Sequence, residues 1–279
     1  MKNINKEKNY NFVNNEELEV GKKFSKNGFC IFDIKETNKL EQISLTVKEL
    51  VTKHLKTNSN KFDLNSLHSY CDKKNINNLR FSVFKKLNKE KWLRSTYYNI
   101  FKKHLDMLVG NELSMQNQLN LSIQMPKDKS STLPMHADSF NGESPFEVVA
   151  WLPLVNCFGS NSMYFVPPNI SNKLVMKLNK YSKKNMGGLK KITKNFKFEK
   201  YFMKINYGQA LIFSANYLHG NRLNKTNQTR TSLNTRFKSL LSPYTSNEKT
   251  LGAFYEPVII KTITKKGINF KKPGKFSLK

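Results

Sequence analysis

At 279 residues, with 38% hydrophobic and 12% aromatic residues, the chain is long enough to bury a full core and too apolar to be disordered. Its three cysteines are widely spaced and odd in number, so they suggest neither a disulfide framework nor a cysteine-type zinc site. No apolar run approaches the roughly 20 residues of a membrane span, and the N-terminus lacks an apolar signal core. The sequence therefore predicts a cytoplasmic protein.

The formal net charge of +28 points to a nucleic-acid partner at first sight, but its make-up favours a simpler explanation. Only five of the 48 basic residues are arginines, and asparagine is also abundant. An AT-rich coding sequence gives this excess of lysine and asparagine, so most of the charge is interpreted as solvated surface. Three of the arginines lie between residues 222 and 236. In a chain this rich in lysine, we expect an arginine where the planar guanidinium group is needed and not only its charge.

The first 110 residues are predicted to be mainly helical. Residues 15–34 have the pattern of a short helix, a turn at Gly28 and a strand. Residues 38–57 place their apolar side chains at helical spacing, which predicts an amphipathic helix, and helical patterns continue to about residue 110.

After Gly110 the pattern changes to short strands divided by proline, glycine and asparagine turns. The predicted strands are 119–125, 146–155, 162–168, 208–213 and 230–237. Strands without long helices between them suggest an antiparallel sandwich or barrel, and a jelly roll is the natural candidate. We therefore predict one domain (1–279), whose helical part (1–110) precedes a jelly-roll core (111–260), with a basic insertion (169–204) and a basic tail (261–279).

His136, Asp138 and His219 form the constellation that carries chemistry. His136 and Asp138 make an HxD motif after a strand and a proline, and His219 follows the apolar strand 208–213. Two histidines and one carboxylate are the ligand set of a facial triad, which holds Fe(II) and leaves three positions for a bidentate 2-oxo acid and O2. An isolated HxD is weak evidence, so this prediction depends on the context of all three ligands.

A dicarboxylate bound to the metal at one end needs a cation at the other, and a guanidinium can pair with a carboxylate in bidentate fashion. Alternate residues of the strand 230–237 share one face, which carries Arg230, Ser232, Asn234 and Arg236. We predict Arg230 as the anchor of the co-substrate, with Arg236 as the alternative anchor, and Asn234 and Arg236 as substrate-binding residues. The alternative is a solvent-facing edge strand.

The stretch from His219 to Arg230, HG-x3-NKT-x3-R, resembles the phytanoyl-CoA dioxygenase-type Fe(II)/2-oxoglutarate oxygenases when combined with the upstream HxD. Within that group, PMHADSFNGESPFEVVAWLPLVN and SMYFVPP are similar to oxygenases of bacterial carbohydrate and streptomycin-type biosynthetic clusters. The resemblance covers residues 119–237 well and the helical part loosely. It implies a double-stranded β-helix, with iron on His136, Asp138 and His219.

The resemblance also implies roles around the metal. Arg230 would bind the far carboxylate of 2-oxoglutarate, with Ser232 beside it. Trp151 and Asn221 would lie near the co-substrate, although core packing is an equal alternative for Trp151. Gln124, on the strand before the HxD, is a further candidate for this site.

The implied reaction is the oxidative decarboxylation of 2-oxoglutarate to succinate and CO2, coupled to oxidation of an aliphatic carbon. Because Asp138 is a carboxylate, iron has no open halide position, and hydroxylation is favoured over halogenation. The resemblance points to a small-molecule substrate in carbohydrate biosynthesis. The oligomeric state cannot be inferred from the sequence.

Two lysine clusters add a hypothesis about the substrate. Residues 171–204 hold eleven lysines and one acidic residue, and residues 261–279 hold seven lysines and none. If the clusters meet over the metal, they form a positive rim that suits a phosphorylated or nucleotide-linked sugar. The rim would include Lys183, Lys184, Lys190 and Lys191.

Two rival functions stay open at this point. The spacing of Arg230 and Arg236 is similar to the R-x5-R pattern of AlkB-like nucleic-acid demethylases, but HxD and His219 are further apart than is usual in such proteins. A steeply salt-dependent affinity for single-stranded DNA would favour that function. A cupin-like metal-binding protein without catalysis is the other rival, and failure to form succinate would favour it.

Overall fold

The computed structural model of the protein describes residues 12–178, 200–245 and 248–270. Within these ranges, no helix combines the length and the apolar character needed to cross a membrane. Much of the predicted lysine rim lies outside the described residues, including residues 271–279 of the tail and Lys183, Lys184, Lys190 and Lys191.

The first elements follow the predicted order of helix, glycine turn and strand. Helix α1 (Asn15–Asn27) begins after Asn14, whose side chain accepts a hydrogen bond from the amide of Glu17. The helix ends at Gly28, where φ is 78°, a left-handed conformation that costs glycine little. Strand β1 (Phe29–Asp33) follows directly, so this prediction is confirmed.

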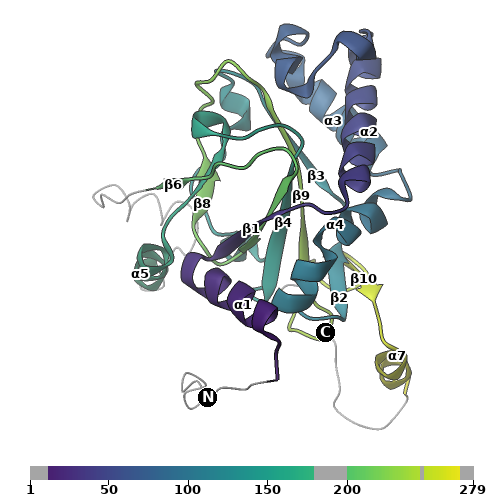
Figure 1. Cartoon of the computed structure of the whole chain (residues 1–279), viewed down its shortest axis with the longest axis vertical. Coiled ribbons are helices and arrows are strands. Elements are labelled where there is room, and N and C mark those ends of the chain that lie inside the picture. The colour runs from purple at the N-terminus through teal and green to yellow at the C-terminus, as the bar shows by residue number, and fades with distance from the viewer. Residues whose placement is uncertain (1–11, 179–199, 246–247, 271–279) are drawn as a thin grey trace.

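Three further helices form a layer on one side of the molecule (Figure 1). They are α2 (Thr37–Leu55), α3 (Ile76–Leu87) and α4 (Leu93–Leu108). Helix α2 buries Leu40, Ile43, Val47 and Val51, which recur at helical spacing and so form one apolar stripe. The predicted helical N-terminal region is therefore confirmed.

The rest of the chain is mainly antiparallel β-structure. Its strands are β2 (Leu113–Gln116), β3 (Asn120–Gln124), β4 (Glu147–Pro153), β5 (Met163–Phe165), β6 (Tyr201–Phe202), β7 (Gln209–Ser214), β8 (His219–Asn221), β9 (Arg230–Ser239) and β10 (Tyr255–Ile259). Among the described residues, the seven-stranded sheet has the order β1-β7-β4-β9-β2-β10, with β3 also paired to β9. A smaller sheet has the order β6-β5-β8.

Aromatic side chains join the two sheets across the core. Phe165 of the small sheet packs against Phe29 and Phe213 of the large one, with ring centroids 5.3 and 5.0 Å apart. On the helical side, the hydroxyl of Tyr97 in α4 lies 3.1 and 3.2 Å from the carbonyl oxygens of Ala150 and Leu233. The molecule is thus a β-sandwich covered by helices, as predicted.

The strand predictions were right in type and incomplete in number. All five predicted strands exist, but that at 162–168 is shorter, because helix α5 (Pro168–Leu178) begins at a proline, which favours the first turn of a helix. Strands β2, β6, β8 and β10 were not predicted, and a further short helix, α7 (Thr262–Ile268), lies near the C-terminus. Strand β10 contains Pro257, which argues against a strand in sequence, although an edge strand tolerates it. The single-domain organisation stays a prediction.

Candidate metal centre and its cavity

A reciprocal backbone contact brings the two predicted histidine ligands together. The amide of His136 donates to the carbonyl of His219 at 2.9 Å, and the amide of His219 donates to the carbonyl of His136 at 2.8 Å. Asp138 follows two residues later, at the start of a 3-10 helix (Asp138–Asn141). The HxD segment and β8 are therefore held side by side although they are far apart in sequence.

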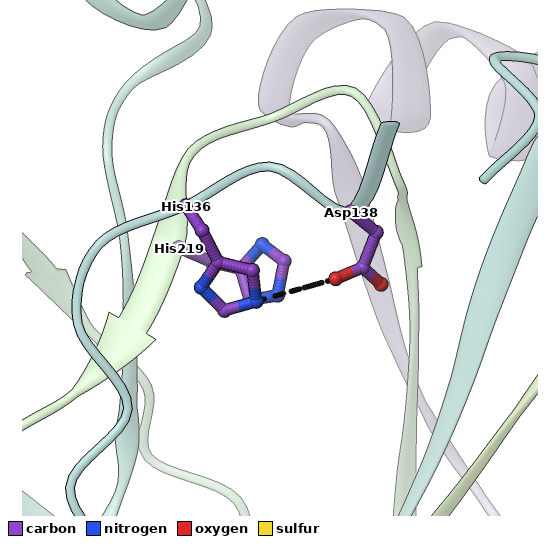
Figure 2. Close-up of side chains that lie close together, drawn as sticks. All are labelled: His136, Asp138 and His219. Carbon is purple, nitrogen blue, oxygen red and sulfur yellow. Dashed lines mark ion pairs between the residues drawn. The ribbon is translucent and has the colours of Figure 1, made fainter. Parts of the chain in front are cut away.

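The donor atoms of the three side chains face one point (Figure 2). Asp138 Oδ1 lies 3.2 Å from His136 Nε2 and 3.7 Å from His219 Nε2, and one ligand atom of each residue lies within 4.8 Å of the others. All three residues are buried. This spacing suits three ligands of a single ion.

Each imidazole is oriented by a backbone carbonyl two residues before it. His136 Nδ1 lies 2.8 Å from the carbonyl oxygen of Pro134, and His219 Nδ1 lies 2.9 Å from that of Tyr217. Because a carbonyl only accepts, Nδ1 carries the proton in each ring and Nε2 presents its lone pair. The residues present therefore fit a divalent transition metal.

Burial and contacts within the triad shift the pKa of each of its members. Burial lowers the pKa of His219 to about 4, so its ring is neutral at pH 7. Burial alone would raise the pKa of Asp138, but the contact with His136 and the guanidinium of Arg236 hold it well below its usual range. Burial opposes protonation of His136 as well, yet the hydrogen bond with Asp138 raises its pKa.

Arg236 pairs with the metal-ligand candidate Asp138. Its Nη2 lies 3.0 Å from Asp138 Oδ2, and its Nη1 donates to Gln116 Oε1 at 3.1 Å. Two further carboxylates are near, because Nε lies 3.4 Å from Glu147 Oε1 and Nη2 lies 3.8 Å from Glu143 Oε1. Burial would lower the pKa of Arg236, but these carboxylates raise it.

Arg230 has a different environment. It is 3% exposed, and its Nη2 donates to Ser122 Oγ at 2.9 Å. Its Nε has no hydrogen-bond partner, and within the described part of the chain no carboxylate pairs with it. Burial lowers the pKa of Arg230, as expected for a desolvated cation without a counter-ion.

One cavity of about 300 Å³ connects the triad with both arginines. Its lining residues are Asn120, Leu121, Ser122, Leu133, His136, Asp138, Val149, Trp151, Met163, Phe213, His219, Gly220, Asn221, Arg230, Asn234 and Arg236. The cavity thus brings together eight of the predicted site residues: the triad, Trp151, Asn221, Arg230, Asn234 and Arg236.

Two amides in this lining already have partners. Asn221 accepts from the amide of Leu133 at 2.5 Å and donates to the carbonyl of Ser131 at 3.0 Å, so it secures the segment before His136. Asn234 accepts from the side chain of Asn120 at 3.1 Å across the β3–β9 pair.

Ser232 and Gln124 lie outside the lining of the cavity. Ser232 is fully buried opposite Ser122, and its hydroxyl has no partner in the described structure. Gln124 donates from Nε2 to the carbonyl of Arg222 at 2.6 Å.

Sequence reasoning missed Ser122, Asn120 and the acidic partners of Arg236. Ser122 and Asn120 share a strand face with Gln124, so the polar alternation in 119–125 is a signal that could have found them. Glu143 and Glu147 had no such signal, because their role depends on a contact with a strand about 90 residues later.

No protein-family model matches the sequence, and no curated protein matches it. Among solved structures, the chain is similar to the nickel complex of the non-haem monooxygenase ThoJ, at 13% identity and a TM-score of 0.56, covering 87% of this chain and 84% of that chain. It is similar to SnoK, a non-haem α-ketoglutarate-dependent carbocyclase from nogalamycin biosynthesis, at 11% identity and a TM-score of 0.54, covering 89% and 98%. A complex of the epimerase SnoN with Fe3+, α-ketoglutarate and nogalamycin RO matches at 13% identity and a TM-score of 0.51, covering 83% and 86%.

The fold is the double-stranded β-helix. Likeness at this low identity concerns the fold, and it confirms the predicted jelly-roll class.

Proposed function

We propose that this protein is an Fe(II)- and 2-oxoglutarate-dependent oxygenase that acts on a small molecule. The observation that carries the proposal is the joint presence, in one cavity, of a buried two-histidine, one-carboxylate site and a buried guanidinium without a carboxylate partner in the described structure. A buried charge is costly unless it is paired, so Arg230 is a natural receptor for an anionic group.

The solved structures support the same proposal. ThoJ and SnoK are non-haem enzymes by description, SnoK depends on α-ketoglutarate, and the SnoN complex holds Fe3+ and α-ketoglutarate. Since fold likeness alone does not carry function, the argument depends on the side chains of this chain.

In the proposed site, His136, Asp138 and His219 hold Fe(II), and Arg230 binds the far carboxylate of 2-oxoglutarate with Ser122 supporting the guanidinium. Arg230 is preferred over Arg236 because Arg236 already pairs with Asp138. With O2, iron and 2-oxoglutarate would supply the oxidising chemistry and yield succinate and CO2. The residues of the chain itself would bind and orient the metal, the co-substrate and the substrate, and would exclude water from the cavity.

Other lining residues complete the proposed pocket. Val149, Met163 and Phe213 give it apolar walls, and Trp151 lies on the same strand as Val149. We assign Trp151 to the co-substrate side and Asn234 to contacts with bound ligand. Asn221 acts by holding the segment that leads to His136.

The finer parts of the proposal concern the reaction and the substrate. We propose hydroxylation of an aliphatic carbon, because the carboxylate ligand Asp138 occupies the position that a halide would need. A phosphorylated or nucleotide-linked sugar in carbohydrate biosynthesis is the proposed substrate class, supported by the lysine-rich segments.

The test is anaerobic absorption spectroscopy of the protein with Fe(II) and 2-oxoglutarate. We expect a weak visible charge-transfer band that is absent in His136→Ala and retained in His104→Ala. His104 is a matched control, because its ring stacks on Phe32 away from the cavity. If the wild type binds Fe(II) and shows no band, the oxygenase proposal fails and a metal-binding cupin-like protein takes its place.

A further inference from the structure

The two oxygens of Asp138 have different partners. Oδ1 faces the ring nitrogens of His136 and His219, at 3.2 and 3.7 Å, and Oδ2 accepts from Arg236 Nη2 at 3.0 Å. The carboxylate is therefore divided between the candidate metal position and a guanidinium.

The guanidinium of Arg236 is itself held from several directions. Gln116 on β2 accepts from Nη1 at 3.1 Å, and Glu147 on β4 lies 3.4 Å from Nε. Glu143, in the loop after Asp138, lies 3.8 Å from Nη2 and also pairs with Lys249. With its side chain only 15% exposed, Arg236 has little freedom to turn toward another partner.

Occupancy of Oδ2 matters because a carboxylate can bind a metal through one oxygen or two. In a site with three protein ligands, bidentate binding by the carboxylate would remove one of the three positions that co-substrate and O2 require. A fixed hydrogen bond to the second oxygen prevents this and orients the first.

We propose that Arg236 is a positioning residue for Asp138, which holds Oδ2 so that Oδ1 alone is offered to the metal. The inference rests on the proposed function for the identity of the metal, but its geometry concerns only this chain. It replaces the sequence-based prediction that Arg236 binds substrate, because the donors of Arg236 that reach the site are engaged with protein.

The test uses Co(II) as the probe, with titration for the Kd and visible absorption for the coordination. Arg236→Gln should raise the Kd by about 10- to 100-fold, the usual effect of losing a partner of a metal ligand, and change the intensity of the Co(II) bands. Arg236→Lys should recover part of the affinity, because it keeps the charge but loses the planar fork. A wild-type Kd and spectrum in Arg236→Gln would overturn the proposal.

Arg222→Gln is the matched control, because it removes the same charge from a guanidinium that stacks 3.9 Å from the Phe202 ring, outside the cavity lining. The Co(II) Kd of Arg222→Gln should equal that of the wild type. If its Kd rises as much as that of Arg236→Gln, the loss of one positive charge would explain both increases, and the proposal would be overturned. If neither Arg236 variant folds, Gln116→Leu decides: it removes a contact of Arg236, and an unchanged Co(II) Kd would reject the inference.

Failure of this inference is separate from failure of the proposed function. Co(II) binding requires neither 2-oxoglutarate nor turnover, so the Arg236 result stands even if no charge-transfer band forms with Fe(II). Conversely, the wild type could show the Fe(II) and 2-oxoglutarate band while Arg236→Gln binds Co(II) as the wild type does. That result would reject the inference about Arg236 and leave the proposed function standing.

Discussion

Arg230 and Arg236 lie on the same strand and line the same cavity, yet they differ in their acidic neighbours. Arg236 is close to three carboxyl groups, on Asp138, Glu143 and Glu147. Arg230 has a hydroxyl partner and no carboxylate in the described structure. At the residue scale, this difference is the basis for proposing that Arg236 orients Asp138 and that Arg230 binds an anion.

Arg230→Ala should therefore weaken 2-oxoglutarate binding and leave the metal bound. A lost hydrogen bond to a charged group is worth about 1.5–3 kcal/mol, or about 10- to 150-fold in Kd. The measurement is titration of the Fe(II)-dependent band with 2-oxoglutarate under anaerobic conditions. Arg222→Ala is the control and should bind 2-oxoglutarate as the wild type does. If Arg236→Ala instead loses 2-oxoglutarate and keeps iron, the anchor is wrongly assigned.

At the element scale, β8 connects the metal site to its surroundings through three consecutive residues. His219 pairs with the backbone of His136, and Asn221 holds the amide of Leu133. Gly220 lies between them in close contact with the HxD segment and β5: an added Cβ would be 2.8 Å from Tyr164 Oη and 3.0 Å from the carbonyl oxygen of Leu133. The close approach of these segments thus depends on the absence of a side chain at Gly220.

Gly220→Ala should displace β8, lower the affinity for Co(II) and reduce the free energy of unfolding by about 1–3 kcal/mol, the range of overpacking in a core. Gly21→Ala is the matched control, because Gly21 is in helix α1 and an added Cβ there meets nothing within 4 Å. That control should stabilise the protein by up to about 1 kcal/mol and leave metal affinity unchanged. Urea unfolding measures the stability of the two variants, and Co(II) titration measures their metal affinity. Equal changes in the two variants would contradict the role of Gly220.

At the scale of the whole molecule, a buried acidic residue links two strands of the large sheet that are not neighbours, β4 and β10. Glu147 on β4 accepts a hydrogen bond from Tyr255 on β10 and lies 3.4 Å from Arg236 Nε. Burial raises the pKa of Glu147 to about 8 and outweighs the opposing effects of Tyr255 and Arg236. Between pH 4.5, the usual pKa of this group, and about 8, the folded protein therefore keeps a proton on Glu147 that the unfolded chain releases.

This proton makes stability depend on pH. Between pH 4.5 and about 8 the folded state binds more protons than the unfolded state, so the contribution of Glu147 to stability falls as pH rises and levels off above about 8. Glu147→Gln removes the proton but can keep the acceptor for Tyr255, so the variant should gain stability relative to the wild type as pH rises through this window. Urea unfolding of the metal-free proteins at pH 5, 7 and 9 measures the difference, and a difference that is constant with pH would contradict the raised pKa.

The sequence was most informative where structure is local. The helix before Gly28, the apolar stripe of α2 and the five predicted strands were read from spacing and turn residues alone, because hydrophobic periodicity and backbone freedom act over a few residues. Strand β8 was missed since three residues, His219–Asn221, carry no periodic signal, and its pairing with β5 is a tertiary contact.

By itself, the sequence predicted the class of fold and a candidate ligand set, because strand patterns limit which layers can form and residue types limit which metals can bind. Only the tertiary structure decided which arginine is free to bind a carboxylate, since that depends on acidic residues brought to Arg236 from other strands and loops. It also excluded Ser232 and Gln124 from the cavity lining and added Ser122 to it, although Ser122 and Ser232 are paired across β3 and β9. The sequence shows which chemical groups the chain contains. The fold decides which charged groups lie next to one another.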